Sequence, residues 1–142
     1  MPSKNPKPNR SWSMYPVLHN NVLQLLAEDD LLFTFYNNDD DRTSTTQYDT
    51  NIMGRFTCRN RSCSSDGWFS KRIAITIRMY AGKRYNARVY HQRCQHCKSL
   101  SKPWLDESYA ERIAYRLKKW SGVDVEVSIY SGQSKPTPEQ PL

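Results

Sequence analysis

The sequence predicts an α+β fold: a small antiparallel β-sheet or hairpin with a C-terminal helix packed on it and an N-terminal helix. Three observations support this class. Residues 68–80 and 85–90 alternate apolar and polar side chains, as strands do. Residues 106–120 carry an apolar stripe at helical spacing. Four cysteines form two close pairs that flank the two predicted strands, so a bound metal ion can staple so small a sheet.

The N-terminal third predicts one helix, one strand and a loop. Residues 1–13 are rich in Pro, Asn and Lys and are expected to be disordered. Within a segment spanning 14–50, a helix is expected over Pro16–Ala27, a strand over Leu31–Tyr36, and an acidic loop over Asn37–Thr46. The apolar face of the helix comprises Leu18, Val22, Leu25 and Leu26.

A second segment, 51–130, is predicted to hold the main domain. A short strand at Arg55–Thr57 leads to the first cysteine pair, and Trp68–Tyr80, a turn, and Tyr85–Tyr90 form a hairpin that ends at the second pair. Because the hairpin folds back on itself, the distant cysteine pairs are expected to meet.

The C-terminal part predicts a helix followed by a strand. The helix is expected from Asp106, as its N-cap, to Trp120, and Gly122 ends it. Val123–Tyr130 alternates and predicts a last strand, and the Pro-rich tail 131–142 is expected to be disordered. The stripe of the helix comprises Tyr109, Ile113, Leu117 and Trp120.

The spacing of the cysteines predicts a zinc site. Cys58 and Cys63 are separated by four residues, and Cys94 and Cys97 by two. Two short-spaced pairs joined by a longer insert are typical of a tetrahedral four-thiolate zinc site, and soft thiolates favour Zn²⁺ over Mg²⁺ or Ca²⁺. Two alternatives are a pair of disulfides, disfavoured because residues 1–16 contain no apolar stretch of the kind found in signal peptides, and a redox-active pair at Cys94–Cys97. Reduced thiols lead us to expect a cytoplasmic or nuclear protein.

The positive charge is concentrated around the cysteines. Residues 51–102 carry twelve Lys/Arg and one Asp, a net charge of +11, whereas residues 1–50 carry −3. Such a segment predicts a polyanionic partner, RNA or single-stranded nucleic acid, although a solvated basic face is an equal alternative. The candidate phosphate-binding residues are Arg59, Arg61, Arg72, Arg78, Arg84, Arg88 and Arg93.

Aromatic and histidine side chains near the cysteines have two interpretations each. Trp68 and Phe69 are expected to cover the zinc core, with stacking on an unpaired base as the alternative. His91 and His96 are expected to lie outside the coordination sphere, with replacement of one cysteine ligand as the alternative.

Several motifs in one order resemble a known family. They are Met53–Cys58 (MGRFTC), Gly67–Lys71 (GWFSK), Tyr85–Tyr90 (YNARVY), Gln92–Cys97 (QRCQHC) and Tyr109–Trp120. Together they resemble the 3CxxC-type zinc finger family, and within it the small fungal members. The family's relatives include receptor-transporting and zygote arrest proteins. The resemblance implies zinc binding through the paired cysteines, with a role in RNA binding or in escorting membrane receptors.

The sequence departs from this family in one respect. The family is named for three C-x-x-C pairs, and this sequence has no cysteine after Cys97. The four thiols present still suffice for one closed site.

These observations predict a zinc-binding module that binds nucleic acid through a basic hairpin face. The alternative is a protein-interaction adaptor, or a receptor-escort-type chaperone, without nucleic-acid binding; no transmembrane segment is expected. No catalytic constellation is recognisable, so the chain is not expected to be an enzyme. A catalytic or redox thiol protein remains a third hypothesis.

Overall fold

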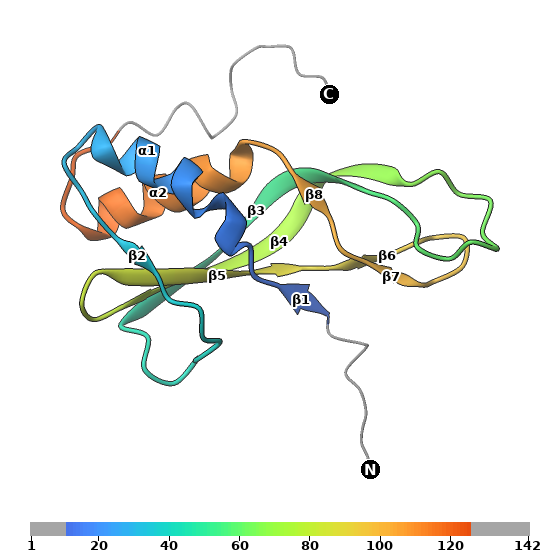
Figure 1. Cartoon of the computed structure of the whole chain (residues 1–142), viewed down its shortest axis with the longest axis horizontal. Helices are drawn as coiled ribbons and strands as arrows, with labels where there is room; N and C mark the ends of the chain where they lie inside the picture. The colour runs from blue at the N-terminus through green and yellow to red at the C-terminus, as the bar shows by residue number, and fades with distance from the viewer. Residues whose placement is uncertain (1–10, 126–142) are drawn as a thin grey trace.

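The computed structural model describes residues 11–125 and shows a curled, mainly antiparallel sheet covered on one face by two helices (Figure 1). This confirms the predicted α+β class. The elements, in chain order, are β1 Trp12–Ser13, the 3₁₀ turn η1 Pro16–Leu18, α1 His19–Ala27, β2 Thr34–Phe35, β3 Thr46–Phe56, β4 Trp68–Tyr80, β5 Arg84–Tyr90, β6 Gln92–Arg93, β7 Leu100–Ser101, β8 Trp104–Leu105 and α2 Ser108–Trp120.

The sheet is built around the long strands β3, β4 and β5. Its strand order is β1-β5-β4-β3-β8, with β2 added in parallel to β5, while β6 and β7 form a separate two-stranded ribbon. Ile73, Ile75 and Ile77 of β4 are buried, as the alternation predicts. The predicted hairpin is confirmed: β4 and β5 pair antiparallel around a turn in which Gly82 has φ +85°.

The helices close the core over this sheet. Helix α2 packs on β3 and β4, and α1 packs on α2. Tyr109, Ile113 and Leu117 are fully buried, as the predicted stripe requires, and they meet Val22 and Leu26 of α1. Because both helices contribute to one core, the N-terminal segment is part of the same folded unit as the sheet.

Helix α2 begins two residues later than predicted. Its first turn is nevertheless held as expected, because a carboxylate oxygen of Asp106 accepts the backbone N–H of Ser108 at 2.8 Å. Gly122, with φ +85°, follows the end of the helix.

Three sequence-based predictions need correction. Residues 12–13, expected to be disordered, pair with β5, where Trp12 lies opposite Tyr90. The strand expected over Leu31–Tyr36 is only two residues long, because the chain leaving α1 first turns at Asp30, whose φ is +58°. The strand expected at Arg55–Thr57 is the end of the longer β3, which crosses the proposed 50/51 boundary.

Only the beginning of the predicted last strand lies within the described residues. Residues 123–125 of the predicted Val123–Tyr130 strand form no strand. Residues 126–130, the predicted tail 131–142 and most of the predicted disordered N-terminus lie outside the described residues.

Candidate metal centre

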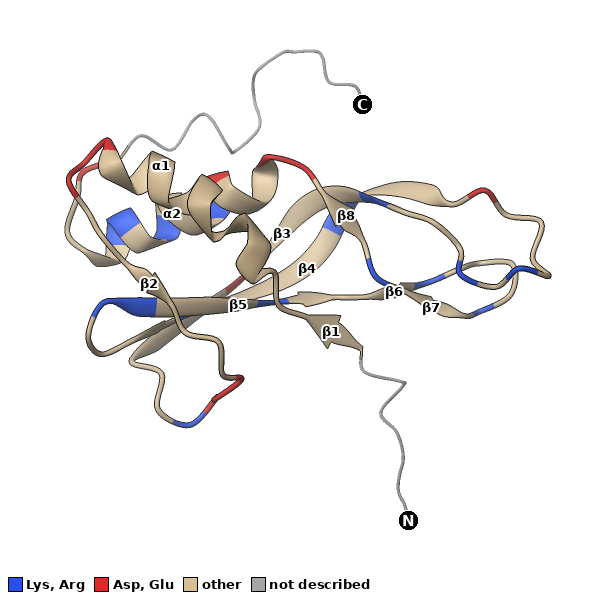
Figure 2. Cartoon of the chain, viewed as in Figure 1, with Lys and Arg blue, Asp and Glu red and all other residues tan. Residues whose placement is uncertain are grey.

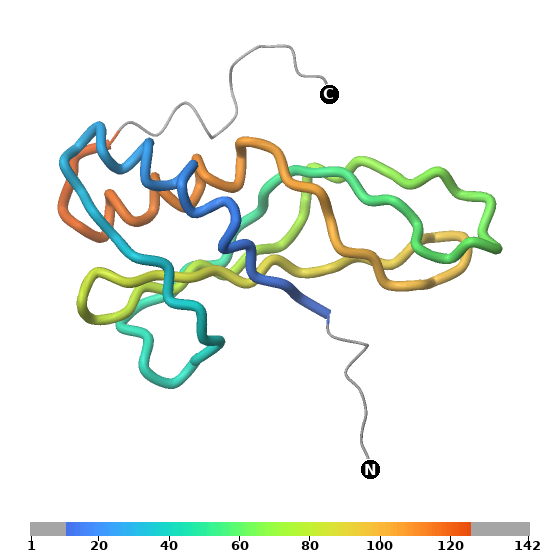
Figure 3. The backbone as a smooth tube through the Cα atoms, viewed as in Figure 1, coloured from blue at the N-terminus to red at the C-terminus, as the bar shows by residue number. Residues whose placement is uncertain are grey.

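Two loops at one end of the molecule carry the four cysteines. The first loop joins β3 to β4 and holds Cys58 and Cys63; the second joins β6 to β7 and holds Cys94 and Cys97. Figure 3 shows the two loops side by side at the end of the molecule away from the β4–β5 turn. The antiparallel pairing of β4 with β3 and β5 therefore brings the far pair beside the near pair.

The sulfur atoms are close enough to share one ion. All four Sγ atoms lie within 4.8 Å of one another. The Cys58–Cys97 pair is 3.4 Å apart and the Cys63–Cys94 pair 3.8 Å. A zinc ion about 2.3 Å from each of four sulfurs gives tetrahedral edges of about 3.8 Å. The four thiol donors and their spacing therefore fit Zn²⁺. Each of the two short sulfur–sulfur contacts joins a cysteine of the first loop to a cysteine of the second.

Local backbone bonds shape each loop around its sulfurs. In the first loop the N–H of Cys63 donates to the carbonyl of Asn60 at 2.9 Å. In the second, Lys98 N–H donates to the carbonyl of Cys94 at 2.8 Å, and Lys98 itself has φ +66°. These tight turns point two sulfurs of each loop to the same side.

Neighbouring donors favour the thiolate form at the second loop. The hydroxyl of Ser99 lies 2.9 Å from the Cys97 sulfur, and chiefly through this bond it lowers the pKa of Cys97 to about 5. Backbone N–H groups of Cys97 and His96 lower the pKa of Cys94. Sequence reasoning did not identify Ser99, whose role depends on the fold of the turn.

The pKa of the Cys63 thiol shifts in the opposite direction, toward the protonated form. The N–H of Ser65 favours its thiolate, but burial and the three neighbouring sulfurs oppose it and raise its pKa to about 12. Four sulfurs this close cannot all ionise without a cation among them. The cluster therefore requires a positive ion at its centre to become a tetrathiolate.

Packing between the loops fixes their separation. Trp68 stacks on Phe56 with ring centroids 4.8 Å apart, and its indole N–H donates to the Gln92 side-chain oxygen at 3.0 Å. The hydroxyl of Ser101 donates to the carbonyl of Thr57 at 2.6 Å. Trp68 therefore joins the strand after the first loop to the strand before the second. Phe69, which was predicted to cover the zinc core with Trp68, is instead 39% exposed.

Gly67 makes the approach of the first loop to β3 possible. Its φ is +113°, and a Cβ placed there would lie 2.1 Å from the carbonyl oxygen of Phe56. Only glycine fits this position without displacing the backbone.

The histidines lie outside the sulfur cluster. The metal-ligating group found among residues 11–125 comprises the four cysteines alone. His91 Nε2 lies 2.8 Å from the Ser13 hydroxyl, and His96 is exposed. The structure therefore gives neither histidine the place of a cysteine.

A mixed sheet stapled by two cysteine turns defines a zinc-ribbon type of metal-binding domain. The sequence model of a 3CxxC-type zinc-ribbon family, described as a zinc-binding domain, matches residues 51–141. The chain belongs to this family, and zinc is its metal. No curated protein and no solved structure matched the chain. The narrower resemblance to fungal members stays a prediction, as does the assignment of each cysteine as a ligand.

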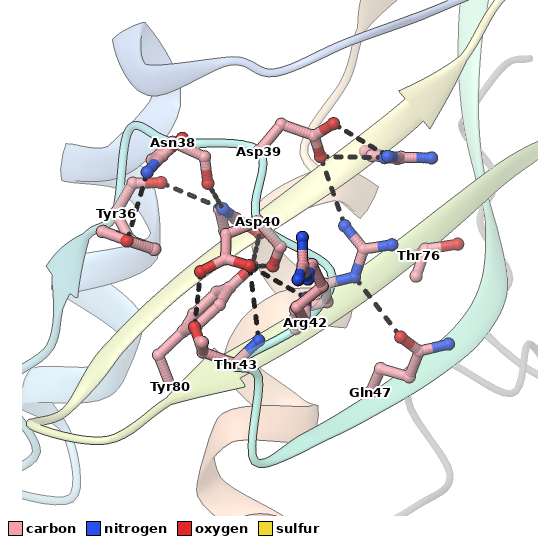
Figure 4. Close-up of polar contacts among 12 residues, drawn as sticks. Tyr36, Asn38, Asp39, Asp40, Arg42, Thr43, Gln47, Thr76 and Tyr80 are labelled. Carbon is pink, nitrogen blue, oxygen red and sulfur yellow. Dashed lines mark hydrogen bonds and ion pairs between the residues drawn. The ribbon is translucent and has the colours of Figure 1, made fainter.

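The predicted basic face separates into two groups, and the first is held by the acidic loop between β2 and β3. Asp39 bonds to two arginines, as Figure 4 shows: its Oδ1 accepts from Arg78 at 3.3 Å, and both its oxygens accept from Arg88 at 2.9 and 2.8 Å. The bond to Asp39 raises the pKa of Arg88. Arg78 is only 5% exposed, which corrects the prediction that it lies on an open basic face.

The loop that carries Asp39 is itself anchored. The Asn86 amide, 1% exposed, donates to the carbonyls of Tyr36 and Asn38 at 3.0 and 2.8 Å. The Tyr80 hydroxyl donates to the carbonyl of Asp40 (Figure 4). The opposite charges of residues 1–50 and 51–102 were the available sequence signal for this contact, but they did not identify the partners.

The second group lies in and beside the cysteine loops, with Arg59 and Arg61 in the first loop, Arg93 in β6, and Arg72 in β4 next to Gln92. Arg59, Arg61, Arg72 and Arg93 are exposed, and we call these four the zinc-end arginines. Figure 2 shows several Lys and Arg segments in and near the loops beside β6, β7 and β8, in addition to those on α2 and β5. Arg84, by contrast, lies at the other end of the hairpin, 4.3 Å over the Tyr36 ring.

Proposed function

We propose that this protein is a zinc-stabilised module that binds RNA or other single-stranded nucleic acid through the zinc-end arginines. The observation that supports it is the division of the predicted basic face into arginines held by Asp39 and exposed arginines near the cysteine loops. Arg78 and Arg88 share the Asp39 carboxylate and are partly buried, whereas the four zinc-end arginines face solvent. The surface offered to phosphates is thus the zinc end rather than the whole hairpin.

The local charge favours a polyanion even after the metal site is counted. Residues 57–72 and 91–102 carry seven Lys/Arg and one Asp, a net charge of +6. A zinc ion with four thiolates contributes about −2. The remaining charge of about +4 is positive and is carried mainly by guanidinium groups, which bind phosphates bidentately.

In this proposal the zinc ion is structural and the protein is not an enzyme. Four thiolates close the coordination sphere and leave no open position for an activated water. The thiols must stay reduced to hold zinc, so we place the protein in the cytoplasm or nucleus. Among the described residues, neither helix has the length and apolar character that crossing a membrane requires.

The proposal is tested by fluorescence anisotropy with a labelled oligouridine RNA of about 12 nucleotides at two salt concentrations. Wild-type affinity should fall steeply with salt. The double variant Arg61→Glu/Arg72→Glu should bind at least about tenfold more weakly, and its salt slope should be shallower by about 1.4, or 0.7 for each lost phosphate contact.

The control has the same net charge in a different place. Lys83→Glu/Lys119→Glu changes exposed lysines in the β4–β5 turn and the last turn of α2, at the end opposite the cysteine loops (Figure 1). This variant should bind RNA nearly as the wild type does. Equal losses of RNA affinity in both variants would show a net-charge effect and no specific role of the zinc-end arginines. RNA affinity that does not change with salt concentration would also overturn the proposal.

A further inference from the structure

An open apolar groove lies between η1 and the chain that runs from β7 into β8. Its volume is about 520 Å³. Its apolar lining comprises Tyr15, Val17, Leu18, Pro103, Trp104 and Leu105.

Two of these side chains are unusually exposed for their type. Val17 is 80% exposed and Trp104 is 70% exposed, although both belong to ordered elements. A large aromatic that faces water at the side of an apolar hollow is the arrangement that protein interfaces use as an anchor point.

The groove is already formed. The Tyr15 hydroxyl donates to the carbonyl of Pro103 at 2.5 Å, which ties the start of η1 to the chain before β8. Trp104 and Leu105 are held by their antiparallel pairing with Arg55 and Gly54 of β3. A ligand therefore meets a fixed surface and loses little free energy to ordering it.

The charges beside the groove define the kind of ligand. The polar part of its lining is Thr57, Arg59, Ser101 and Lys102. Arg59 and Lys102 are both exposed, and no carboxylate is among the described lining residues. The Lys102 ammonium lies 4.9 Å over the Tyr15 ring, at the boundary of the apolar floor. An apolar hollow with two cations beside it is complementary to an apolar side chain with a neighbouring carboxylate.

We propose that this groove binds a short acidic peptide segment of a partner protein, with an apolar side chain inserted between Val17 and Trp104 and a carboxylate near Lys102. A nucleobase stacked on Trp104 is the competing occupant, but the aliphatic Val17, Leu18 and Leu105 that line the rest of the groove favour an apolar side chain. The proposal does not depend on nucleic-acid binding at the zinc end.

A random peptide library displayed on phage, selected on the zinc-loaded full chain, tests the proposal. Selected peptides should contain a large apolar residue beside Asp or Glu. Synthetic versions should bind Trp104→Ser at least tenfold more weakly than wild type. Lys102→Glu should reverse the selected charge, so that Lys or Arg replaces the acidic neighbour.

Two controls keep the outcome interpretable. Trp104 and Lys102 are exposed, so their variants should retain the wild-type zinc content and backbone amide spectrum. Leu32→Ser, at another exposed apolar residue 69% open to solvent, should leave peptide binding unchanged. No enrichment, or enriched peptides that bind Trp104→Ser equally, would overturn the proposal. Loss of oligouridine binding in Trp104→Ser without any peptide binding would also overturn it, and would make the groove a base-stacking site.

Discussion

Removing the Asp39 carboxylate should destabilise the fold more than any other change in the acidic loop. The carboxylate makes three charge-assisted contacts, two to Arg88 at 2.9 and 2.8 Å and one to Arg78 at 3.3 Å. In Asp39→Ala, water replaces part of the hydrogen bonding that Arg88 loses, because the Arg88 side chain is 21% exposed. Water reaches Arg78 far less, because its side chain is only 6% exposed, and its hydrogen bond to Gln47 is long at 3.3 Å.

The size of the effect follows from these contacts. Hydrogen bonds to charged groups contribute about 1.5–3 kcal/mol each, and breaking a buried ion pair from one side costs about 3–5 kcal/mol. Asp39 is 22% exposed, so the lower end of that range applies. We expect a loss of about 3 kcal/mol, equivalent to a fall of roughly 2 M in the urea midpoint at a slope near 1.5 kcal/mol/M.

The assay is urea unfolding of the zinc-loaded protein, followed by circular dichroism. Asp41→Ala, which removes an exposed carboxylate from the same loop, gives the same net charge and should shift the midpoint by less than about 0.3 M. If Asp39→Ala and Asp41→Ala unfold at the same urea concentration, the acidic loop does not stabilise the hairpin arginines and the reasoning fails.

Two further predictions concern the backbone at Gly67 and the pH dependence of stability. Gly67→Ala should lower the free energy of unfolding in urea by at least about 2 kcal/mol, because the new residue would combine φ +113° with a Cβ 2.1 Å from the Phe56 carbonyl oxygen. Gly122→Ala, at φ +85° but in open space, should lower it by about 1 kcal/mol. Equal losses would show that the Phe56 oxygen does not crowd position 67. Burial lowers the pKa of His19, which is bonded to the Tyr85 hydroxyl, so the unfolded chain takes up its proton more readily. Wild type should therefore lose stability relative to His19→Gln as pH falls below about 6.5, and parallel stability curves would refute this.

The central strands and the longer helix were predictable because their patterns are regular. Trp68–Tyr80 has the predicted bounds, since three isoleucines alternate with polar residues along it. Most of β3 was not predicted, because Thr46–Asn51 is polar on both faces and contains no apolar alternation. Trp12 and Ser13 form a strand only because β5 offers them an edge, a tertiary effect that local composition does not contain.

The clustering of the cysteines was easier to predict than the surfaces around it. The cysteine spacing predicts that four sulfurs meet, and the structure brings them within 4.8 Å. By contrast, seven arginines looked equivalent in the sequence, and only the path of the acidic loop shows that Asp39 holds Arg78 and Arg88. The exposed position of Trp104 likewise depends on where β8 joins the sheet.

Zinc-edge X-ray absorption of the purified chain measures the coordination sphere itself. A single shell of four sulfurs at about 2.3 Å, at one zinc per chain, is the result predicted from the clustered Cys58, Cys63, Cys94 and Cys97. A shell containing nitrogen or oxygen, or zinc bound by fewer than four sulfurs, would contradict a closed tetrathiolate.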